Sequence, residues 1–522
     1  MGTQALGHEL HHGRIVRAHA ARPADISAMF AAAVARAHRR IAVVDGDLRI
    51  DYATLEAHVA ASAAALAARG IGKRDRVALL LGNRADLLVA VLATARLGGI
   101  VVPMNIRQKA PETAYVLDLT GATVLLHEAD LAGELPPAAD CPALRHSIAI
   151  DDDRRLWSLP GQAPPPPVEA DEDAPFAILC TSGTTGRPKG AVLTHLSAIT
   201  SVLAAREALG LGDGEVTVLA VPASHVTGLV LELLQMIGVA GTTVMMRGFK
   251  AAAFLKLAVR ERMTYTCMVP AMYNLCLLDP EMARSDLSAW RAGTFGGAPM
   301  PESSVAALGE CLPQLRLTNI YGATETSSPA VMMPSEQIAA RRHQVGRPLP
   351  HVDLLIMDEA GHEVPRGQQG EIWLGGAMTV PCYWNNPQAT TDAFVAGYWR
   401  SGDVGTLDAD GYLQLCDRKK DMINRGGYKI YSVEVENVLM AHPAVIEAGV
   451  VGRPCAVLGE RTQAFIYGGE EVSEEALRGW CAARLSDYKV PDGFTLSRSP
   501  LPRNANGKLL KTELRRAAAA AA

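Results

Sequence analysis

The stretch Thr181-Ser-Gly-Thr-Thr-Gly-Arg-Pro-Lys-Gly190 decides how the rest of the chain is interpreted. Its small and hydroxyl residues let successive backbone N–H groups turn toward an anion, and Lys189 adds a positive charge, so it predicts a phosphate-binding loop. The loop of nucleotide hydrolases reads G-x-x-x-x-G-K followed by Ser or Thr. Counted from Gly183, Pro188 stands where that pattern needs its second glycine, and Gly190 where it needs the hydroxyl residue. Because proline has no N–H and a fixed φ, that cradle cannot form, and the loop is of another type.

Length, charge and cysteine content exclude several classes of protein. A chain of 522 residues exceeds one hydrophobic core, so roughly two or three domains are expected. The net charge of −5 shows no basic excess, which disfavours nucleic acid as a partner. None of the nine cysteines forms a C-x-x-C pair, which disfavours a metal cluster and a disulfide framework. We therefore expect a cytoplasmic protein.

The N-terminal region and one long apolar run raise two alternatives. The first residues contain no apolar stretch, so they predict no signal peptide. His8-Glu-Leu-His-His12 spells the H-E-x-x-H zinc motif, but without an apolar helix or third ligand we interpret it as a chance match in a disordered tail. The run Val226–Met246 is long enough to span a bilayer. Because it contains Glu232 and Gln235, we predict instead a buried helix followed by a strand, and no transmembrane segment.

Short apolar strands alternate with Ala-rich helices in the first part of the chain. Predicted strands at Ile41–Val44 and Val77–Leu81 stand beside predicted helices at Thr54–Arg69 and Arg84–Leu97. This alternation favours α/β layers with largely parallel sheets.

The segment before the phosphate loop predicts an exposed connector. Residues 163–168 are rich in proline and residues 169–173 are acidic. They lead into Phe176–Cys180, the strand that ends at the loop. A helix is predicted from about Ser197, which gives the order strand, loop, helix.

A change in composition near residue 417 predicts a domain boundary. The charged cluster Asp417–Asp421 is followed by a compact α/β pattern, and the last alanines are expected to fray. We therefore predict an N-terminal domain over residues 1–417 and a C-terminal domain over 418–522. The four elements predicted in the latter are helices at Val433–Ala441 and Glu474–Leu485 and strands at Ile446–Gly452 and Gln463–Tyr467.

Three further segments have side chains suited to nucleotide chemistry. In Asn319-Ile-Tyr-Gly-Ala-Thr-Glu-Thr326 the tyrosine can stack on a base and the Thr-Glu pair can reach phosphate and Mg²⁺. In Ser401-Gly-Asp403 the carboxylate could accept ribose hydroxyls, and Arg418 could reach the same group. The turn Pro502–Lys508 would project its lysine from a loop tip. Taken one at a time, each is explained as well by an ordinary turn or a solvated charge.

In this order and spacing, these segments resemble the adenylate-forming superfamily, which includes acyl-CoA synthetases, carrier-loading adenylation domains and luciferases. The stretches DRKKDMINRGGYKIYSVEVE and LPRNANGKLLK add to the resemblance, which covers about residues 25 to 515. It implies an α/β protein with a large N-terminal domain of two α/β-layered sheets plus a β-barrel, and a small mobile α+β C-terminal domain. It also implies that a carboxylic acid and ATP give an acyl-adenylate and pyrophosphate, and that a thiol then displaces AMP.

The resemblance assigns the functional residues position by position. Lys508 is implied to be the catalytic lysine, with Glu325 and Thr184 as Mg²⁺ ligands. Gly426, Gly427 and Tyr428 are implied to face the pantetheine of CoA after the small domain rotates. The remaining positions implied to bind ATP are Thr181, Ser182, Gly183, Thr185, Gly186, Lys189, Gly297, Ala298, Pro299, Asn319, Tyr321, Gly322, Ala323, Thr324, Asp403 and Arg418. Lys420, also implied to belong to the site, is placed at the hinge between the domains.

Two positions indicate which class of carboxylic acid is activated. Pro222–Gly228 matches the family's P-x-x-H-x-x-G segment, which implies that His225 lies where the acid pocket meets the pantetheine channel; the plainer interpretation is a packed histidine. Amino-acid-activating relatives carry an Asp in this segment, and its absence disfavours an amino acid. At Gly322 acetate-activating relatives have Trp, so a larger acid is expected. Apolar candidates for the pocket wall, such as Leu229 and Met268, suit an aliphatic chain or an aromatic ring, and both stay open.

CoA is the favoured acceptor. The sequence shows no attached carrier domain and no extra segment between the predicted domains. The alternative is a free-standing ligase that loads an acyl carrier protein. The sequence excludes neither a monomer nor a homodimer.

Overall fold

The computed structural model describes residues 5–161, 166, 168–181, 188–298, 300–455, 457–469, 472–503 and 509–520. The chain forms two compact units. The larger comprises Met1–Ala298, Ser304–Leu354 and Leu374–Trp399, and the smaller comprises Pro299–Ser303, Leu355–Trp373 and Arg400–Ala522. The boundary expected from composition between residues 417 and 418 stays a prediction.

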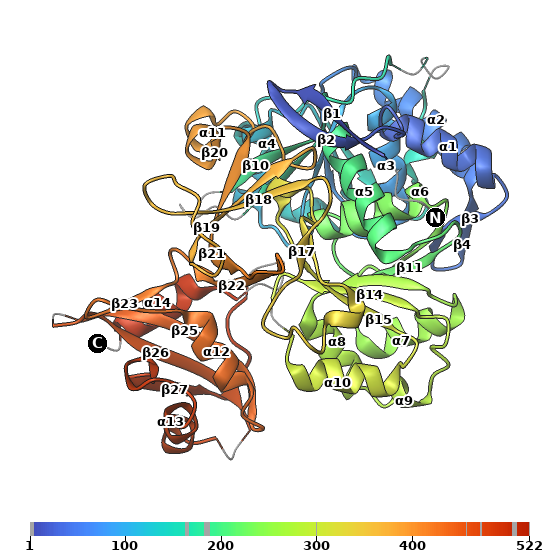
Figure 1. The fold of residues 1–522 in the computed structure, drawn as a ribbon. Helices are drawn as coiled ribbons and strands as arrows, with labels where there is room; N and C mark the ends of the chain where they lie inside the picture. The colour runs from blue at the N-terminus through green and yellow to red at the C-terminus, as the bar shows by residue number, and fades with distance from the viewer. Residues whose placement is uncertain are drawn as a thin grey trace. The chain divides into compact units, whose positions relative to one another are not determined.

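The larger unit is built on two sheets of mainly parallel strands (Figure 1). In the first, only the pair β10 and β9 is antiparallel. Its order is β10 (Lys189–Thr194), β9 (Pro175–Thr181), β6 (Ile100–Pro103), β5 (Arg76–Leu80), β7 (Val124–Glu128) and β8 (His146–Ile150).

The second sheet is parallel in its centre and antiparallel at both edges. Its order is β17 (Arg347–Pro348), β16 (Val331–Met332), β15 (Arg316–Tyr321), β14 (Ala292–Gly296), β13 (Tyr265–Met268), β11 (Val216–Leu219), β12 (Thr242–Met245), β3 (Ile41–Asp45) and β4 (Leu48–Asp51). The predicted α/β layering with largely parallel sheets is confirmed.

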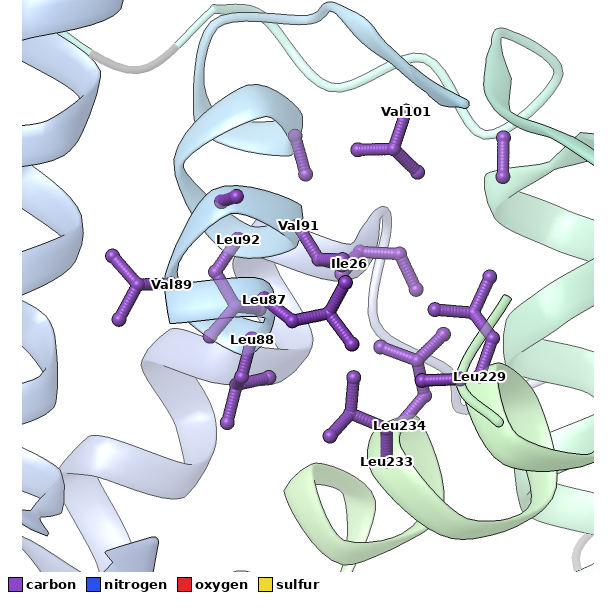
Figure 2. Packing of buried hydrophobic residues seen from close by; sticks show 14 of the residues in the cluster. Ile26, Leu87, Leu88, Val89, Val91, Leu92, Val101, Leu229, Leu233 and Leu234 are labelled. Atoms are coloured by element: carbon purple, nitrogen blue, oxygen red, sulfur yellow. The ribbon is translucent and has the colours of Figure 1, made fainter. Parts of the chain in front are cut away.

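One hydrophobic cluster contains residues of both sheets and of the helices that pack on them. Helix α3 (Ala85–Arg96) is buried from Ala85 to Ala95; most of these residues are apolar, and the buried carboxylate of Asp86 pairs with Arg84 and Arg155. Figure 2 shows its residues Leu87 and Leu92 beside Ile26 of α1 (Ile26–Ala37) and near Leu233 of the helix η4 (Thr227–Leu234). The predicted helix Thr54–Arg69 is α2 (Tyr52–Ala67).

A third sheet has five strands in the order β18-β19-β21-β20, with β22 beside β21. It stands where the resemblance implies a β-barrel. Strands β18, β19 and β21 belong partly to each unit. The strand bounds are β18 (Val352–Met357), β19 (Gly370–Gly376), β20 (Phe394–Val395), β21 (Tyr398–Leu407) and β22 (Leu413–Arg418).

The rest of the smaller unit is a five-stranded sheet covered on both faces. Val450 and Ile466 pack with helices α12 and α13, while their strand neighbours Val451 and Phe465 pack with Leu514 of α14, as alternation along a strand requires. The elements are β23 (Ile423–Arg425), β24 (Tyr428–Ile430), β25 (Val445–Cys455), β26 (Gly459–Gly468), β27 (Gly493–Ser497), α12 (Ser432–Met440), α13 (Glu474–Ala482) and α14 (Lys511–Ala520). The expectation that the last residues fray is wrong for those that belong to α14, because alanine favours helix and Ala518 is buried there; Ala521 and Ala522 lie outside the described residues.

The predicted disordered N-terminal tail is also wrong. Residues Leu6–His11 form β1, which pairs with β2 (Arg14–His19) in a hairpin. On a strand successive side chains point to opposite faces, so His8-Glu-Leu-His-His12 does not place its histidines as a helix would.

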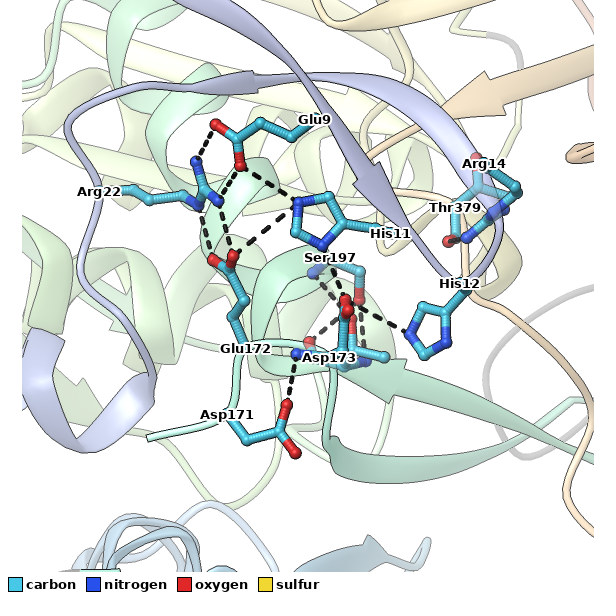
Figure 3. Close-up of polar contacts among 11 residues, drawn as sticks. Glu9, His11, His12, Arg14, Arg22, Asp171, Glu172, Asp173, Ser197 and Thr379 are labelled. Carbon is cyan, nitrogen blue, oxygen red and sulfur yellow. Dashed lines mark hydrogen bonds and ion pairs between the residues drawn. The ribbon is translucent and has the colours of Figure 1, made fainter. Parts of the chain in front are cut away.

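The hairpin is bound to the acidic segment before β9 by ion pairs (Figure 3). The Arg22 guanidinium lies 2.5 Å from a Glu9 oxygen and 2.7 Å from a Glu172 oxygen, and its hydrogen bonds lower the pKa of Glu9 to about 2. His11 Nδ1 lies 2.9 Å from Asp173 Oδ1. Glu9, His11 and Glu172 could group around a cation, but Arg22 already pairs with both carboxylates. The predicted connector is therefore anchored over residues 172–173.

The apolar run Val226–Met246 is a helix followed by a strand, as predicted. It contains η4, which is π-helical, then α6 (Gln235–Gly238) and β12. Among the described residues, no helix combines the length and apolar character needed to cross a bilayer. Glu232 is fully buried in this run, and its Oε1 accepts a hydrogen bond from the backbone N–H of Cys267 at 2.9 Å. Burial raises the pKa of Glu232 to about 8, so the carboxyl is protonated at neutral pH.

Replacement of Glu232 by glutamine should change how stability depends on pH. The folded carboxyl keeps its proton up to about pH 8, whereas the unfolded one loses it near its ordinary value of 4.5. Relative to Glu232→Gln, the wild type should lose about 1.4 kcal/mol of unfolding free energy per pH unit between about pH 5 and 8. Urea unfolding of both proteins across this range measures the difference. Parallel stability curves would contradict a protonated Glu232.

Candidate active site

The phosphate loop connects two antiparallel strands. Thr181 ends β9 and Lys189 begins β10, and the two residues are paired across the hairpin. The predicted order of strand, loop and helix is therefore wrong at its last step, since β10 precedes α5 (His195–Leu209). The predicted positions inside the loop lie outside the described residues; they are Ser182, Gly183, Thr184, Thr185 and Gly186.

A buried carboxylate lies beside the base of this loop. Glu325 belongs to the short helix η5 (Thr324–Thr326), which follows β15. The hydroxyl of Tyr383 donates to Glu325 Oε1 at 2.8 Å, and the hydroxyl of Thr181 lies 3.5 Å from the same oxygen. Lys189 Nζ lies 5.1 Å from the centre of the Tyr383 ring. Thr181 and Glu325, which lie 144 positions apart in sequence, are thus in contact in the structure.

Opposing effects act on the ionisation of Glu325. Burial raises the pKa of this carboxyl above its ordinary value, while the hydrogen bonds from Tyr383 and Thr181 and the charge of Lys189 lower it. A buried carboxylate needs such partners to remain ionised. A bound cation would serve the same purpose, and carboxylate and hydroxyl oxygens are the ligands that Mg²⁺ prefers. The side chains present at this position therefore fit a magnesium ion.

Tyr383 is the functional candidate that the sequence did not indicate. The segment 382–384 lies along β10: Trp384 donates its N–H to the Gly190 carbonyl at 2.7 Å, and Val192 donates to the Cys382 carbonyl at 3.1 Å. Gly190 also has no room for a side chain, since a Cβ would lie 2.7 Å from Ile178 Cγ2. No local motif surrounds the tyrosine, so only this strand pairing reveals its position.

The predicted adenine-binding residues come from two neighbouring parallel strands. The register of β14 and β15 pairs Phe295 with Asn319 and Gly296 with Ile320. Gly297 follows with a φ of +77°, and Tyr321 ends β15. The structure therefore brings Gly297 and Ala298 to the same sheet edge as Tyr321. Pro299 lies outside the described residues.

The turn after Tyr321 is closely packed. Ala330 donates its N–H to the Tyr321 carbonyl, and Ala323 donates to the hydroxyl of Thr326. A Cβ on Gly322 would lie 3.1 Å from the Ala330 nitrogen and 3.2 Å from Pro329 Cα. The packing of this turn therefore explains the glycine as directly as space for an acid does. A tryptophan here would disturb the turn itself.

His225 lies in a turn that holds its imidazole in one state. Its backbone N–H donates to the Pro222 carbonyl at 3.1 Å, and its own carbonyl accepts the N–H of Leu229, the third residue of η4. The Thr227 N–H donates to His225 Nδ1 at 3.3 Å. Because a backbone N–H can only donate, Nδ1 of the neutral ring is the acceptor and the proton is on Nε2.

In the smaller unit the structure brings two predicted ribose ligands together. Asp403 and Arg418 are paired across β21 and β22, and Arg418 Nε lies 3.3 Å from Asp403 Oδ1. Burial is the main cause that lowers the pKa of Lys420. Lys508 lies outside the described residues.

The predicted pantetheine-facing turn is exposed at its end. Gly426 and Gly427 have φ angles of +61° and +91°, which favour glycine. Tyr428 is 60% exposed, and its ring stacks on Tyr488 with centres 4.7 Å apart. The turn therefore presents an aromatic side chain at the surface of the smaller unit.

Comparison with known proteins matches both parts of the chain. The model of a family described as AMP-binding enzyme matches residues 30–384, and that of the AMP-binding enzyme C-terminal domain matches residues 434–508. The long-chain-fatty-acid–CoA ligase FadD13 of Mycobacterium tuberculosis is 34% identical over 476 residues, covering 90% of this chain and 93% of the relative. A feruloyl-CoA synthase of an Amycolatopsis species is 33% identical over 481 residues, covering 91% and 95%.

A solved structure of a CoA synthetase is also similar to this chain. O-succinylbenzoate coenzyme A synthetase of Bacillus subtilis, in complex with ATP and a magnesium ion, superposes with a TM-score of 0.84 at 30% identity. The match covers 93% of this chain and 98% of the other. The predicted fold class is therefore confirmed by a structure as well as by sequence.

Replacement of Tyr383 by phenylalanine tests whether its hydrogen bond affects the pKa of Glu325 and the binding of Mg²⁺. Loss of the donated hydrogen bond should raise the pKa of Glu325 further, and a metal ligand must be deprotonated. Mg²⁺ should then bind about tenfold more weakly at the lower of two pH values, and the difference should shrink at the higher one, where the carboxyl is deprotonated in both proteins. Titration calorimetry of ATP binding at several Mg²⁺ concentrations measures this.

Tyr273→Phe is the matched control for this measurement. Its buried hydroxyl donates to the Thr294 carbonyl, so its loss should leave the Mg²⁺ dependence unchanged. Identical Mg²⁺ dependence in the wild type and Tyr383→Phe at both pH values would show that Tyr383 does not tune Glu325.

Proposed function

Because the chain belongs to the AMP-binding enzyme family, we propose that it is an AMP-forming acid–CoA ligase. In the first step a carboxylic acid and ATP form an acyl-adenylate and pyrophosphate. In the second step the thiol of CoA attacks the acyl carbonyl, the thioester forms and AMP leaves. The observation that carries the proposal is the buried Glu325 carboxylate between Thr181, Lys189 and Tyr383 at the base of the phosphate loop.

The first step brings together groups of the same charge. The acid's carboxylate must approach the α-phosphate of ATP while negative charge accumulates on the departing pyrophosphate. Positive groups placed where that charge develops are the main source of acceleration. We assign Lys189 and the loop residues to the β- and γ-phosphates, and Lys508 to the α-phosphate and the acid.

Glu325 supports the same step through a metal. When bound, Mg²⁺ would be held by Glu325 with Thr184 and would neutralise charge on the phosphates. Tyr383 contributes by donating a hydrogen bond to the buried carboxylate, which favours its ionised form and orients it.

Other residues are candidates for binding the adenine and ribose of ATP. The Tyr321 ring would stack on adenine beside Gly297 and Ala298, and Asp403 with Arg418 would hold the ribose. Thr324, Asn319 and Ala323 are assigned to the same nucleotide.

The second step needs no enzyme nucleophile. The acyl-adenylate is already activated, so the thiol of CoA attacks the carbonyl directly and AMP leaves with the bridging oxygen. Gly426, Gly427 and Tyr428 are assigned to the pantetheine arm and His225 to the end where acid and thiol meet. The relatives act on a long-chain fatty acid and, by its name, on ferulate, which matches the two acid classes left open by the sequence.

Acid-dependent release of pyrophosphate tests the proposal. With Mg-ATP, the wild type should release pyrophosphate only when an acid of the right class is present, and AMP and acyl-CoA should accumulate together only when CoA is added. Fatty acids of increasing length, benzoates and cinnamates form the panel, with acetate and amino acids as negative controls. Phosphate release without acid would contradict the proposal, and adenylate without CoA turnover would indicate a carrier protein as acceptor.

Lys508→Ala should separate the two steps. Loss of its charge should slow adenylate formation by about 10²–10³-fold, by analogy with other groups that stabilise developing charge. The same variant should still convert a supplied acyl-adenylate and CoA into thioester, because that step does not use the lysine. Rapid-quench measurement of each half reaction decides this, and equal loss of both would refute the role.

A further inference from the structure

A single amide joins the carboxyl edges of the two large sheets. Asn83 follows β5 of the first sheet by three residues and is 4% exposed. Its Nδ2 lies 3.0 Å from the carbonyl oxygens of both Leu219 and Val221, and 3.1 Å from that of Met246. Leu219 ends β11 and Met246 follows β12, so this side chain binds the ends of two strands of the second sheet.

The other end of the amide anchors the turn that carries His225. Asn83 Oδ1 accepts the backbone N–H of Ala223 at 3.0 Å. Because the nitrogen faces only carbonyls and the oxygen faces an N–H, the orientation of the amide is fixed. Aspartate has the same shape but no donor, and alanine has neither group.

The turn from Pro222 to Gly228 also has hydrogen bonds within itself. The Pro222 carbonyl accepts the His225 N–H, and His225 Nδ1 accepts the Thr227 N–H. Gly228 packs so closely that a Cβ would lie 2.4 Å from the Pro222 oxygen. These contacts make the turn compact. The hydrogen bond from Ala223 to Asn83 then positions the turn relative to the two sheets.

We propose that Asn83 is a positioning residue for the acid: its amide fixes the His225 turn against the carboxyl ends of β11 and β12. The inference rests on the proposed function, because it assigns His225 to the acid. Asn83 itself touches neither acid nor ATP in this account; it acts through His225.

Loss of the amide has an effect that can be told apart from simple destabilisation. A reacting group displaced by about 1 Å can cost about 10²-fold in rate even when the change is remote from the chemistry. Asn83→Ala should therefore lower kcat/KM for the acid by about 10- to 10²-fold. The KM for ATP should stay within about twofold of the wild type, since the nucleotide residues lie on other strands.

The experiment is a double-mutant cycle between Asn83→Ala and His225→Ala in the full chain, with acid-dependent pyrophosphate release as the readout. If Asn83 acts through His225, its replacement should cost much less in the His225→Ala background than in the wild type. Asn83→Ser provides a second variant, since its hydroxyl cannot reach the same partners. Tyr52→Phe is the matched control: it removes buried hydrogen bonds to the Met236 and Gly241 carbonyls and should lower the melting temperature without changing the KM for the acid.

Three results would overturn the inference. One is an unchanged kcat/KM for the acid in both Asn83 variants. Another is an equal loss in the two backgrounds, and the third is a parallel loss for ATP and acid. A wild type that releases no pyrophosphate with any acid would instead refute the proposed function, so the two failures are distinguishable.

Discussion

The constraint on which the site depends is the burial of a carboxylate at the base of an anion-binding loop. Glu325 is 7% exposed, and burial alone would favour its protonated form. A hydroxyl from each of two distant segments, with a lysine nearby, opposes that effect. These partners favour the ionised form, and an ionised carboxylate is a ligand for a hard cation, which links the fold of the larger unit to phosphate chemistry.

Parallel strands explain why these groups can meet. The carboxyl ends of β14 and β15 lie together, so Gly297 after β14 stands beside Tyr321 and the turn that carries Glu325. In the same way, the loop after β5 reaches the ends of β11 and β12 through Asn83. In open α/β sheets ligands bind outside the carboxyl ends of the strands, and here both sheets contribute to that edge.

The helices and strands that could be predicted from the sequence are those whose signal lies in neighbouring residues. Runs such as Val77–Leu81 form parallel strands because continuous apolar residues of strand length are buried on both faces.

The sequence did not predict β10, because a lysine followed by a short apolar run after a glycine-rich loop does not reveal antiparallel pairing with β9. It missed the position of Tyr383, which depends on pairing between β10 and a segment almost 200 residues later. The N-terminal hairpin was missed for a related reason, since its contacts are with distant segments: Arg22 joins Glu9 to Glu172, and Val16 and Ala18 pack with Leu196 and Ala377. The motif residues themselves were found because their chemistry is local, while their partners were not.

In the proposed reaction the acid's own carboxylate attacks the α-phosphorus of ATP. Turnover of an acid labelled with ¹⁸O in its carboxylate, with CoA present, tests this most directly by mass spectrometry of the released AMP. Each AMP should carry one oxygen from the acid, because the bridging oxygen of the acyl-adenylate leaves with AMP. Unlabelled AMP, or label that appears in inorganic phosphate, would contradict it.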